Sequence, residues 1–282
     1  MLCGMSASKA LEDLKVLLSK VDRKEYFAQA IYWNKKQWMH YQTTYKGKGG
    51  RGIETGRHLK KLLDHSNFLE SINRPITRND VFEKVKSAGR NDEQLVEAFV
   101  MTMVWGFGSW PVGPYRTSVM LESGGRSIGE QLRQVRDLCQ NTDEISRRGA
   151  YDTLLSLEQC GPAFATKFMY FLSPQNCRIP IFDNVVATWL TNRQEKLSAN
   201  NKKHFFDYYK FCVTAAKNSE EEDLGLLEYV MFSDQQATNI KEQLKQLPKW
   251  LVNYRFPNQI IKSASDFDPS GFTDLKNDVE ED

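Results

Sequence analysis

Residues 154–190 read LLSLEQCGPAFATKFMYFLSPQNCRIPIFDNVVATWL, which predicts two helices joined by a tight turn and followed by a third helix. The first helix belongs to residues 143–157 and the turn to residues 158–161. Pro162 suits the first turn of the second helix, because its missing N–H would have no partner there. Residues 163–172 are apolar on most sides, which predicts a buried helix. Asp183 stands just before the apolar pattern of residues 185–190, where a helix N-cap belongs.

This succession resembles the helix-hairpin-helix DNA glycosylases. Within it, residues 160–171 are most similar to bacterial and archaeal proteins with an 8-oxoguanine-glycosylase fold. Their sequence is Cys-Gly-Pro-Ala-Phe-Ala-Thr-Lys-Phe-Met-Tyr-Phe. The resemblance extends over residues 105–190. Gly161 and Asp183 are 22 positions apart, close to the distance that such families keep between the hairpin glycine and an essential aspartate.

The resemblance implies an all-α fold of the helix-hairpin-helix glycosylase type, with two helical subdomains and the active site in the cleft between them. We expect four parts along the chain. Residues 1–75 hold N-terminal helices with a basic glycine-rich loop, and residues 76–195 form the catalytic core with the hairpin. Residues 196–262 form helices that pack back on the core, and residues 263–282 form an acidic, disordered tail. We find no β-alternation in the sequence.

The net charge of +2 conceals an uneven distribution of charge. Residues 35–61 contain eight Lys or Arg against one acid, and residues 266–282 contain seven acids against one lysine. In the segment YKGKGGRG, residues 45–52, glycine permits a close approach to a phosphate backbone while Lys46, Lys48 and Arg51 supply positive charge. A solvated loop without a partner is the alternative interpretation.

The five cysteines are scattered and odd in number, without a Cys-x-x-Cys pair, which favours reduced thiols. The four histidines show no metal-ligand spacing, so we expect no metal and no cofactor. A monovalent cation at the hairpin is left open. Because the sequence has no membrane-length apolar run and no secretory signal, we expect a cytoplasmic, nucleoid-associated monomer that binds DNA and no membrane.

Asp183 fits the chemistry that the resemblance implies. Breaking a C–N glycosidic bond builds positive charge on the sugar, which a nearby carboxylate stabilises. At a helix N-terminus, backbone N–H groups orient a carboxylate and keep it ionised. Taken alone, Asp183 would be an ordinary N-cap that contributes about 1 kcal/mol. The upstream hairpin favours a catalytic role.

The resemblance also implies a question about lysine. In bifunctional members of these families, a lysine just after the hairpin attacks the sugar and forms a Schiff base. Aligning residues 159–161 on the family's Gly-x-Gly turn puts that position at Ala163, which would leave water as the nucleophile. Lys167 lies four residues further on, on the same helix face, and leans back towards the helix N-terminus. We predict that Lys167 is catalytic; a structural pair with Asp183 is the alternative.

The hairpin and its flanks predict the DNA-facing residues, because backbone amides at such a turn bind phosphate. This set is Gln159, Cys160, Gly161, Ala163, Lys46, Lys48, Arg51, Arg147 and Arg148. A flipped base also needs a pocket of aromatic and apolar groups. Residues 105–116, WGFGSWPVGPYR, carry aromatics on a segment that we expect to break the helix. The predicted pocket residues are Trp105, Phe107, Trp110, Tyr115, Phe168 and Phe182.

Three function classes remain open from the sequence. The first is a DNA glycosylase, with 8-oxoguanine as the substrate that the resemblance implies, or a modified phage cytosine in antiviral defence. The second is a non-catalytic hairpin module that binds DNA and recruits a partner. The third is an all-helical protein–protein scaffold. The second class predicts that Asp183 is dispensable, and in the third the basic loop would be merely solvated.

Overall fold

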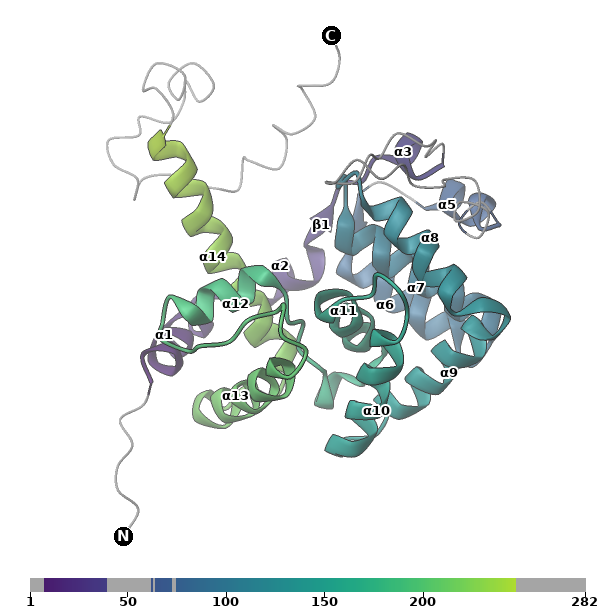
Figure 1. Ribbon diagram of the computed structural model, residues 1–282. Helices are drawn as coiled ribbons and strands as arrows, with labels where there is room; N and C mark the ends of the chain where they lie inside the picture. Colours follow the sequence, from purple (N-terminus) through teal and green to yellow (C-terminus); the bar gives the residue numbers. More distant parts are fainter. Residues whose placement is uncertain (1–7, 40–61, 63, 73–74, 247–282) are drawn as a thin grey trace.

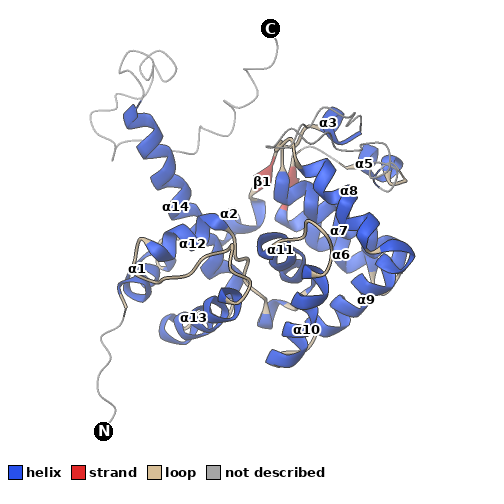
Figure 2. Cartoon of the chain, viewed as in Figure 1, coloured by secondary structure: helices blue, strands red, loops and turns tan. Residues whose placement is uncertain are grey.

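A computed structural model describes residues 8–39, 62, 64–72 and 75–246 of the chain, and within these ranges the fold is all-α, as predicted (Figures 1 and 2). The helices are α1 Lys9–Leu18, α2 Arg23–Ala28, α3 Lys35–Met39, α5 Ser66–Ser71, α6 Arg78–Ala88, α7 Asp92–Phe107, α8 Gly113–Ser123, α9 Ile128–Cys139, α10 Glu144–Leu155, α11 Pro162–Leu172, α12 Asn184–Thr191, α13 His204–Ser219 and α14 Leu224–Gln246. Two 3-10 turns, Gly125–Ser127 and Gln175–Cys177, link α8 to α9 and α11 to α12.

The helices form two packed groups, which lie on opposite sides of Figure 1. In the first group α7 packs against α6, α8 and α9, and α11 packs against α6, α7, α9 and α10. In the second group α14 packs against α1, α12 and α13. The predicted parts do not coincide with these groups, because α1 joins the C-terminal helices whereas α3 and α5 lie with α8 (Figure 1).

Buried charges link the two groups. Arg78 of α6 pairs with Glu228 of α14 at 3.2 Å, and both side chains are almost fully buried. Arg178, which follows α11, pairs with Asp223 just before α14 at 2.7 Å and donates to the Tyr26 hydroxyl. Breaking a buried pair leaves an uncompensated charge and costs about 3–5 kcal/mol. These pairs therefore hold α14 and the residue before it against α6 and against the segment that follows α11.

Local sequence explains several helix ends. Thr77 and Asp80 form a capping box at α6, in which each side chain accepts from the backbone N–H of the other residue. At α7 the cap is Asn91, whose side chain accepts from the backbone N–H of Gln94. The segment 105–116 breaks the helix less than expected, because α7 continues to Phe107 and α8 already begins at Gly113.

One feature of the described chain was absent from the prediction. Strands β1, Ala30–Ile31, and β2, Ile76–Thr77, pair antiparallel. Two-residue strands are too short to show an alternating pattern in the sequence. The basic loop of residues 45–52 and the tail of residues 263–282 lie outside the described residues. Among the helices that are described, none is long and apolar enough to cross a bilayer.

Candidate active site

Lys167 and Asp183 meet where the two helical groups come together. The Lys167 ammonium lies 2.9 Å from Asp183 Oδ2. Asp183 Oδ1 accepts hydrogen bonds from the backbone N–H groups of Val185 and Val186, at 3.1 and 3.2 Å. The predicted N-cap of α12 is therefore confirmed. Since α11 belongs to the first group and α12 to the second, the ion pair bridges them.

The surroundings keep Asp183 ionised. Burial by itself would raise the pKa of Asp183, but the Lys167 ammonium and the two backbone N–H groups outweigh it and hold the pKa below its usual value. Lys167 is only 8% exposed, so the pair is shielded from water. A fixed, water-shielded carboxylate acts strongly on a positive charge that develops beside it.

The segment before Asp183 is anchored by its own apolar residues and by α11. Ile179, Ile181 and Phe182 are buried, and Phe182 stacks on Tyr208 with ring centroids 4.7 Å apart. The backbone N–H of Phe182 donates to Thr166 Oγ1 at 3.0 Å. Thr166 and Lys167 thus hold two consecutive residues of the segment. The sequence offered one signal for Thr166, a polar residue beside a lysine in an apolar helix.

The hairpin turn is formed without a glycine in the strained position. Gln159 has φ 66°, whereas Gly161 caps α11 with an ordinary φ of −86°. Arg116 of α8 donates to the Gln159 carbonyl at 2.8 Å. A side-chain carbon at Gly161 would meet nothing within 4 Å, so the turn faces open space. Cys160, by contrast, is buried.

A row of aromatic rings leads from the ion pair to the surface. The Phe164 ring lies 5.8 Å from the Lys167 ammonium and stacks on Phe107, with ring centroids 3.9 Å apart. Phe107 lies 6.0 Å from Trp110, which is 57% exposed. The Arg116 guanidinium lies over the Phe164 ring at 5.4 Å. Phe164 and Arg116 were not among the predicted site residues, because the contact between them depends on how closely α8 approaches α11.

Comparison with known proteins bears on this arrangement. A family model described as "Putative 8-oxoguanine DNA glycosylase OGG-like protein" matches residues 24–232, more than half of the 282-residue chain. The chain belongs to this family. The matched region of this OGG-like chain contains the hairpin, Lys167, Asp183 and the aromatic row. No curated protein and no solved structure matches it.

Three predicted pocket residues of this OGG-like chain are core residues in the structure. Trp105 packs edge-on against Phe171 at 5.2 Å and Phe168 against Phe99 at 5.1 Å, and Phe182 stacks on Tyr208 as described. All three are buried, which corrects their assignment to the pocket wall. Phe107 is buried too, but its ring stacks on Phe164 beside Lys167 and not in the core, so it remains a prediction for base recognition, as do the exposed Trp110 and the half-buried Tyr115.

The two arginines ahead of the hairpin differ in environment. Arg147 is 2% exposed, donates to the Cys177 carbonyl at 2.9 Å and lies over the Tyr209 ring. Its predicted DNA contact is therefore wrong, because its guanidinium is used inside the fold. Arg148 is exposed, pairs with Glu144 at 2.8 Å and stays a candidate for DNA contact. Lys46, Lys48 and Arg51 lie outside the described residues.

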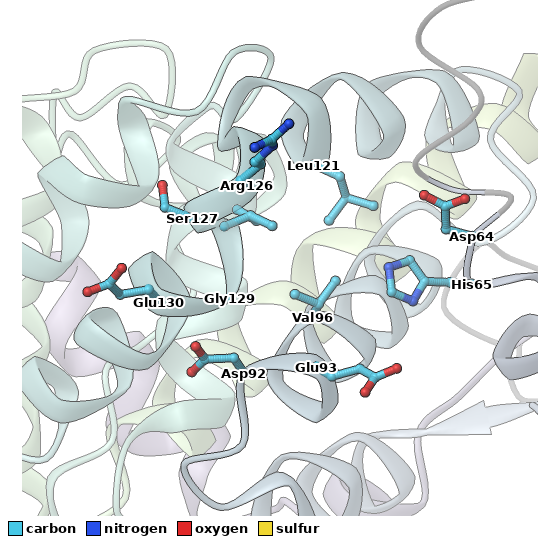
Figure 3. Close-up of a pocket in the computed structure, with 11 residues that line it drawn as sticks. Asp64, His65, Asp92, Glu93, Val96, Leu121, Arg126, Ser127, Gly129 and Glu130 are labelled. Carbon is cyan, nitrogen blue, oxygen red and sulfur yellow. The ribbon is translucent and has the colours of Figure 1, made fainter.

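A surface pocket of the OGG-like chain lies elsewhere (Figure 3). Its lining comes from α7, the start of α9 and the segment before α5, and includes neither Lys167 nor Asp183. The carboxylates of Asp64, Asp92, Glu93 and Glu130 outnumber the one guanidinium in this lining, that of Arg126. Such a lining repels DNA phosphates, so this pocket is a poor candidate for binding a flipped base.

Proposed function

We propose that this chain is a DNA glycosylase, which flips a damaged or modified base out of the duplex and cleaves its N-glycosidic bond. The observation that carries the proposal is the shielded Lys167–Asp183 pair at the junction of the two helical groups. Membership of the OGG-like family adds support.

Asp183 would stabilise the sugar. As the C1′–N bond lengthens, positive charge develops on the sugar ring, and a carboxylate held by two backbone N–H groups needs no reorganisation to stabilise it. The lowered pKa of Asp183 keeps it charged at neutral pH. The same carboxylate can accept a proton from the group that attacks C1′.

Lys167 fits two mechanisms, and we favour the one in which it is the nucleophile. Its ammonium gives up a proton to Asp183, at 2.9 Å, and the free amine bonds to C1′ while the base leaves with the glycosidic electron pair. The proton that Asp183 accepted passes to the departing base. The nitrogen, now bonded to C1′, then loses a proton as the C1′–O4′ bond of the ring breaks and O4′ is protonated, which leaves the opened sugar on Lys167 as a Schiff base. In the alternative mechanism Lys167 only orients Asp183, water attacks C1′, and an intact abasic site is the product.

DNA would approach the face that carries the hairpin turn. Gly161 leaves room for a phosphate, and the backbone of Gln159, Cys160 and Ala163 lies at the N-terminus of α11, where the helix dipole favours an anion. Trp110 is the exposed aromatic at the end of the ring row that starts beside Lys167. These features support an extrahelical base between the aromatic row and the ion pair. Any cation at the hairpin would assist this phosphate contact.

The target base is a further part of the proposal. The family description favours 8-oxoguanine, and a hypermodified phage cytosine is the second candidate, which would imply antiviral defence in place of repair. Duplexes that each contain one modified base, incubated with the protein and then treated with alkali, test both candidates. Strand cleavage at one modified base identifies the substrate.

We expect DNA binding to depend steeply on salt, and the triple variant Lys46→Gln, Lys48→Gln, Arg51→Gln to flatten that dependence. Each lost phosphate contact lowers the slope of log K against log salt by about 0.9. Titrating a labelled duplex at several salt concentrations measures the slope. The matched control is Lys24→Gln, which neutralises an exposed lysine of α2. Arg147 is unsuitable as a control because it is buried. An unchanged slope would exclude this loop from the DNA interface.

Thr166→Val should lower both stability and excision, because it leaves the buried Phe182 N–H without an acceptor. A buried unsatisfied donor costs about 1–3 kcal/mol. Urea unfolding and single-turnover excision measure the two effects. Thr166→Ser keeps the hydroxyl and loses only a methyl, so it should excise at close to the wild-type rate. Equal excision by the Val and Ser variants would show that this hydrogen bond does not position Asp183.

A further inference from the structure

Gly106 lies in the last turn of α7, directly against the side chain of Lys167. A side-chain carbon built at Gly106 would be 3.0 Å from Lys167 Cδ, 3.5 Å from Lys167 Cε and 3.3 Å from the ring edge of Phe164. Carbon atoms in contact normally lie about 3.5–4.0 Å apart. The space above Gly106 is therefore already filled by the lysine stem.

Neither neighbour has an easy way to move. The Lys167 ammonium is anchored to Asp183 at 2.9 Å, and the lysine side chain is buried. The Phe164 ring is stacked on Phe107, which follows Gly106 in the same helix. Glycine is also the weaker helix former, so a glycine inside α7 costs stability unless the missing side chain serves a purpose.

We infer that Gly106 is a positioning residue: its missing side chain forms the slot through which the Lys167 stem reaches Asp183. The inference rests on the proposed function, since the position of the ammonium matters for activity only if Lys167 and Asp183 act on the sugar. A side chain at position 106 would push the stem aside by a few tenths of an ångström and lengthen the contact between the ammonium and the carboxylate. Gly106 would thus act on the reaction only through Lys167.

Gly106→Ala tests the inference, with Gly149→Ala as the matched control. Gly149 also lies inside a helix, α10, but a side-chain carbon there meets only Leu138, at an ordinary 3.4 Å. We expect Gly106→Ala to bind duplex DNA like the wild type and to excise at least about tenfold more slowly under single turnover. Gly149→Ala should match the wild type in both measurements. Wild-type excision by Gly106→Ala would overturn the inference.

The pH dependence of the excision rate provides a second measurement, which a loss of folding would not mimic. Because the ammonium holds the pKa of Asp183 down, moving it away raises that pKa, and the acid limb of the excision rate should shift to higher pH in Gly106→Ala. The control should show no shift. An acid limb at the wild-type position in Gly106→Ala would mean that the ammonium has not moved.

A stability cycle separates this inference from the proposed function, because it needs no substrate. Gly106→Ala should lower the unfolding midpoint in the wild-type background and raise it in Lys167→Ala, where Cδ and Cε are gone and the new methyl fits. If Gly106→Ala alone does not fold whereas Lys167→Ala does, the double variant should fold; its failure to fold would then refute the slot. A chain that shows this coupling but excises no base would refute the proposed function instead.

Discussion

Asp183→Asn should lower the single-turnover rate of base excision by about 10²–10⁴-fold, the range typical for loss of a positioned acid–base group. Asparagine can still accept the N–H hydrogen bonds of Val185 and Val186 through its amide oxygen, so α12 should keep its cap. What disappears is the negative charge beside the sugar. Duplex affinity should stay within a few-fold of the wild type, because the hairpin turn is untouched.

Asp183→Asn should also lower the stability of the folded protein. Lys167 loses its counter-ion in a shielded position, where a hydrogen bond to a charged group contributes about 1.5–3 kcal/mol. A urea unfolding curve is therefore part of the measurement, together with duplex binding and excision. A well-folded Asp183→Asn protein with full activity would rule out the glycosylase mechanism proposed for this site.

Lys167→Gln should abolish excision and covalent trapping together. If the Lys167 amine bonds to C1′, borohydride reduces the Schiff base and leaves the protein attached to its substrate DNA. Wild type should give this adduct and Lys167→Gln should not, because an amide nitrogen is not a nucleophile. Gel electrophoresis of the borohydride-treated reaction measures the adduct. Lys217→Gln, which changes an exposed lysine of α13 away from the site, is the matched control and should trap like the wild type.

A different set of products would identify water, and not Lys167, as the nucleophile. A wild-type reaction that yields an intact abasic site, no adduct, and strand breaks only after alkali would show that water is the nucleophile. Lys167 would then act by holding Asp183, and Lys167→Gln should retain part of the activity. The alignment that places the nucleophile position at Ala163 favours this result, whereas the 2.9 Å contact between Lys167 and Asp183 favours the lysine.

Local sequence patterns were sufficient for the centre of the site. The apolar pattern of residues 185–190 required a cap, and Asp183 is that cap in the structure. Lys167 was notable as a charge in an apolar helix, and its burial beside Asp183 follows because an unpaired ammonium there would be costly. Lys167 was identifiable because it interrupts an apolar helix, and Asp183 because it directly precedes one.

The surroundings of the site depend on contacts between distant segments, which the sequence does not reveal. Trp105 was expected on irregular backbone, but α7 continues through Gly106 and turns the ring into the core against Phe171. Arg147 was expected at the surface, but α13 brings Tyr209 over its guanidinium. The hydrogen bond from Arg116 to the Gln159 carbonyl depends on α8 lying beside the hairpin turn, which the sequence does not show.

The most direct test of the central claim is an excision assay on a panel of duplexes, each with one modified base, using the wild type and Asp183→Asn side by side. Products are treated with alkali and separated on a denaturing gel. We predict strand cleavage at the position of one modified base by the wild type, and none above background by Asp183→Asn. Equal cleavage by both proteins, or binding of every duplex with cleavage of none, would contradict the claim that Asp183 and Lys167 form a glycosylase active site.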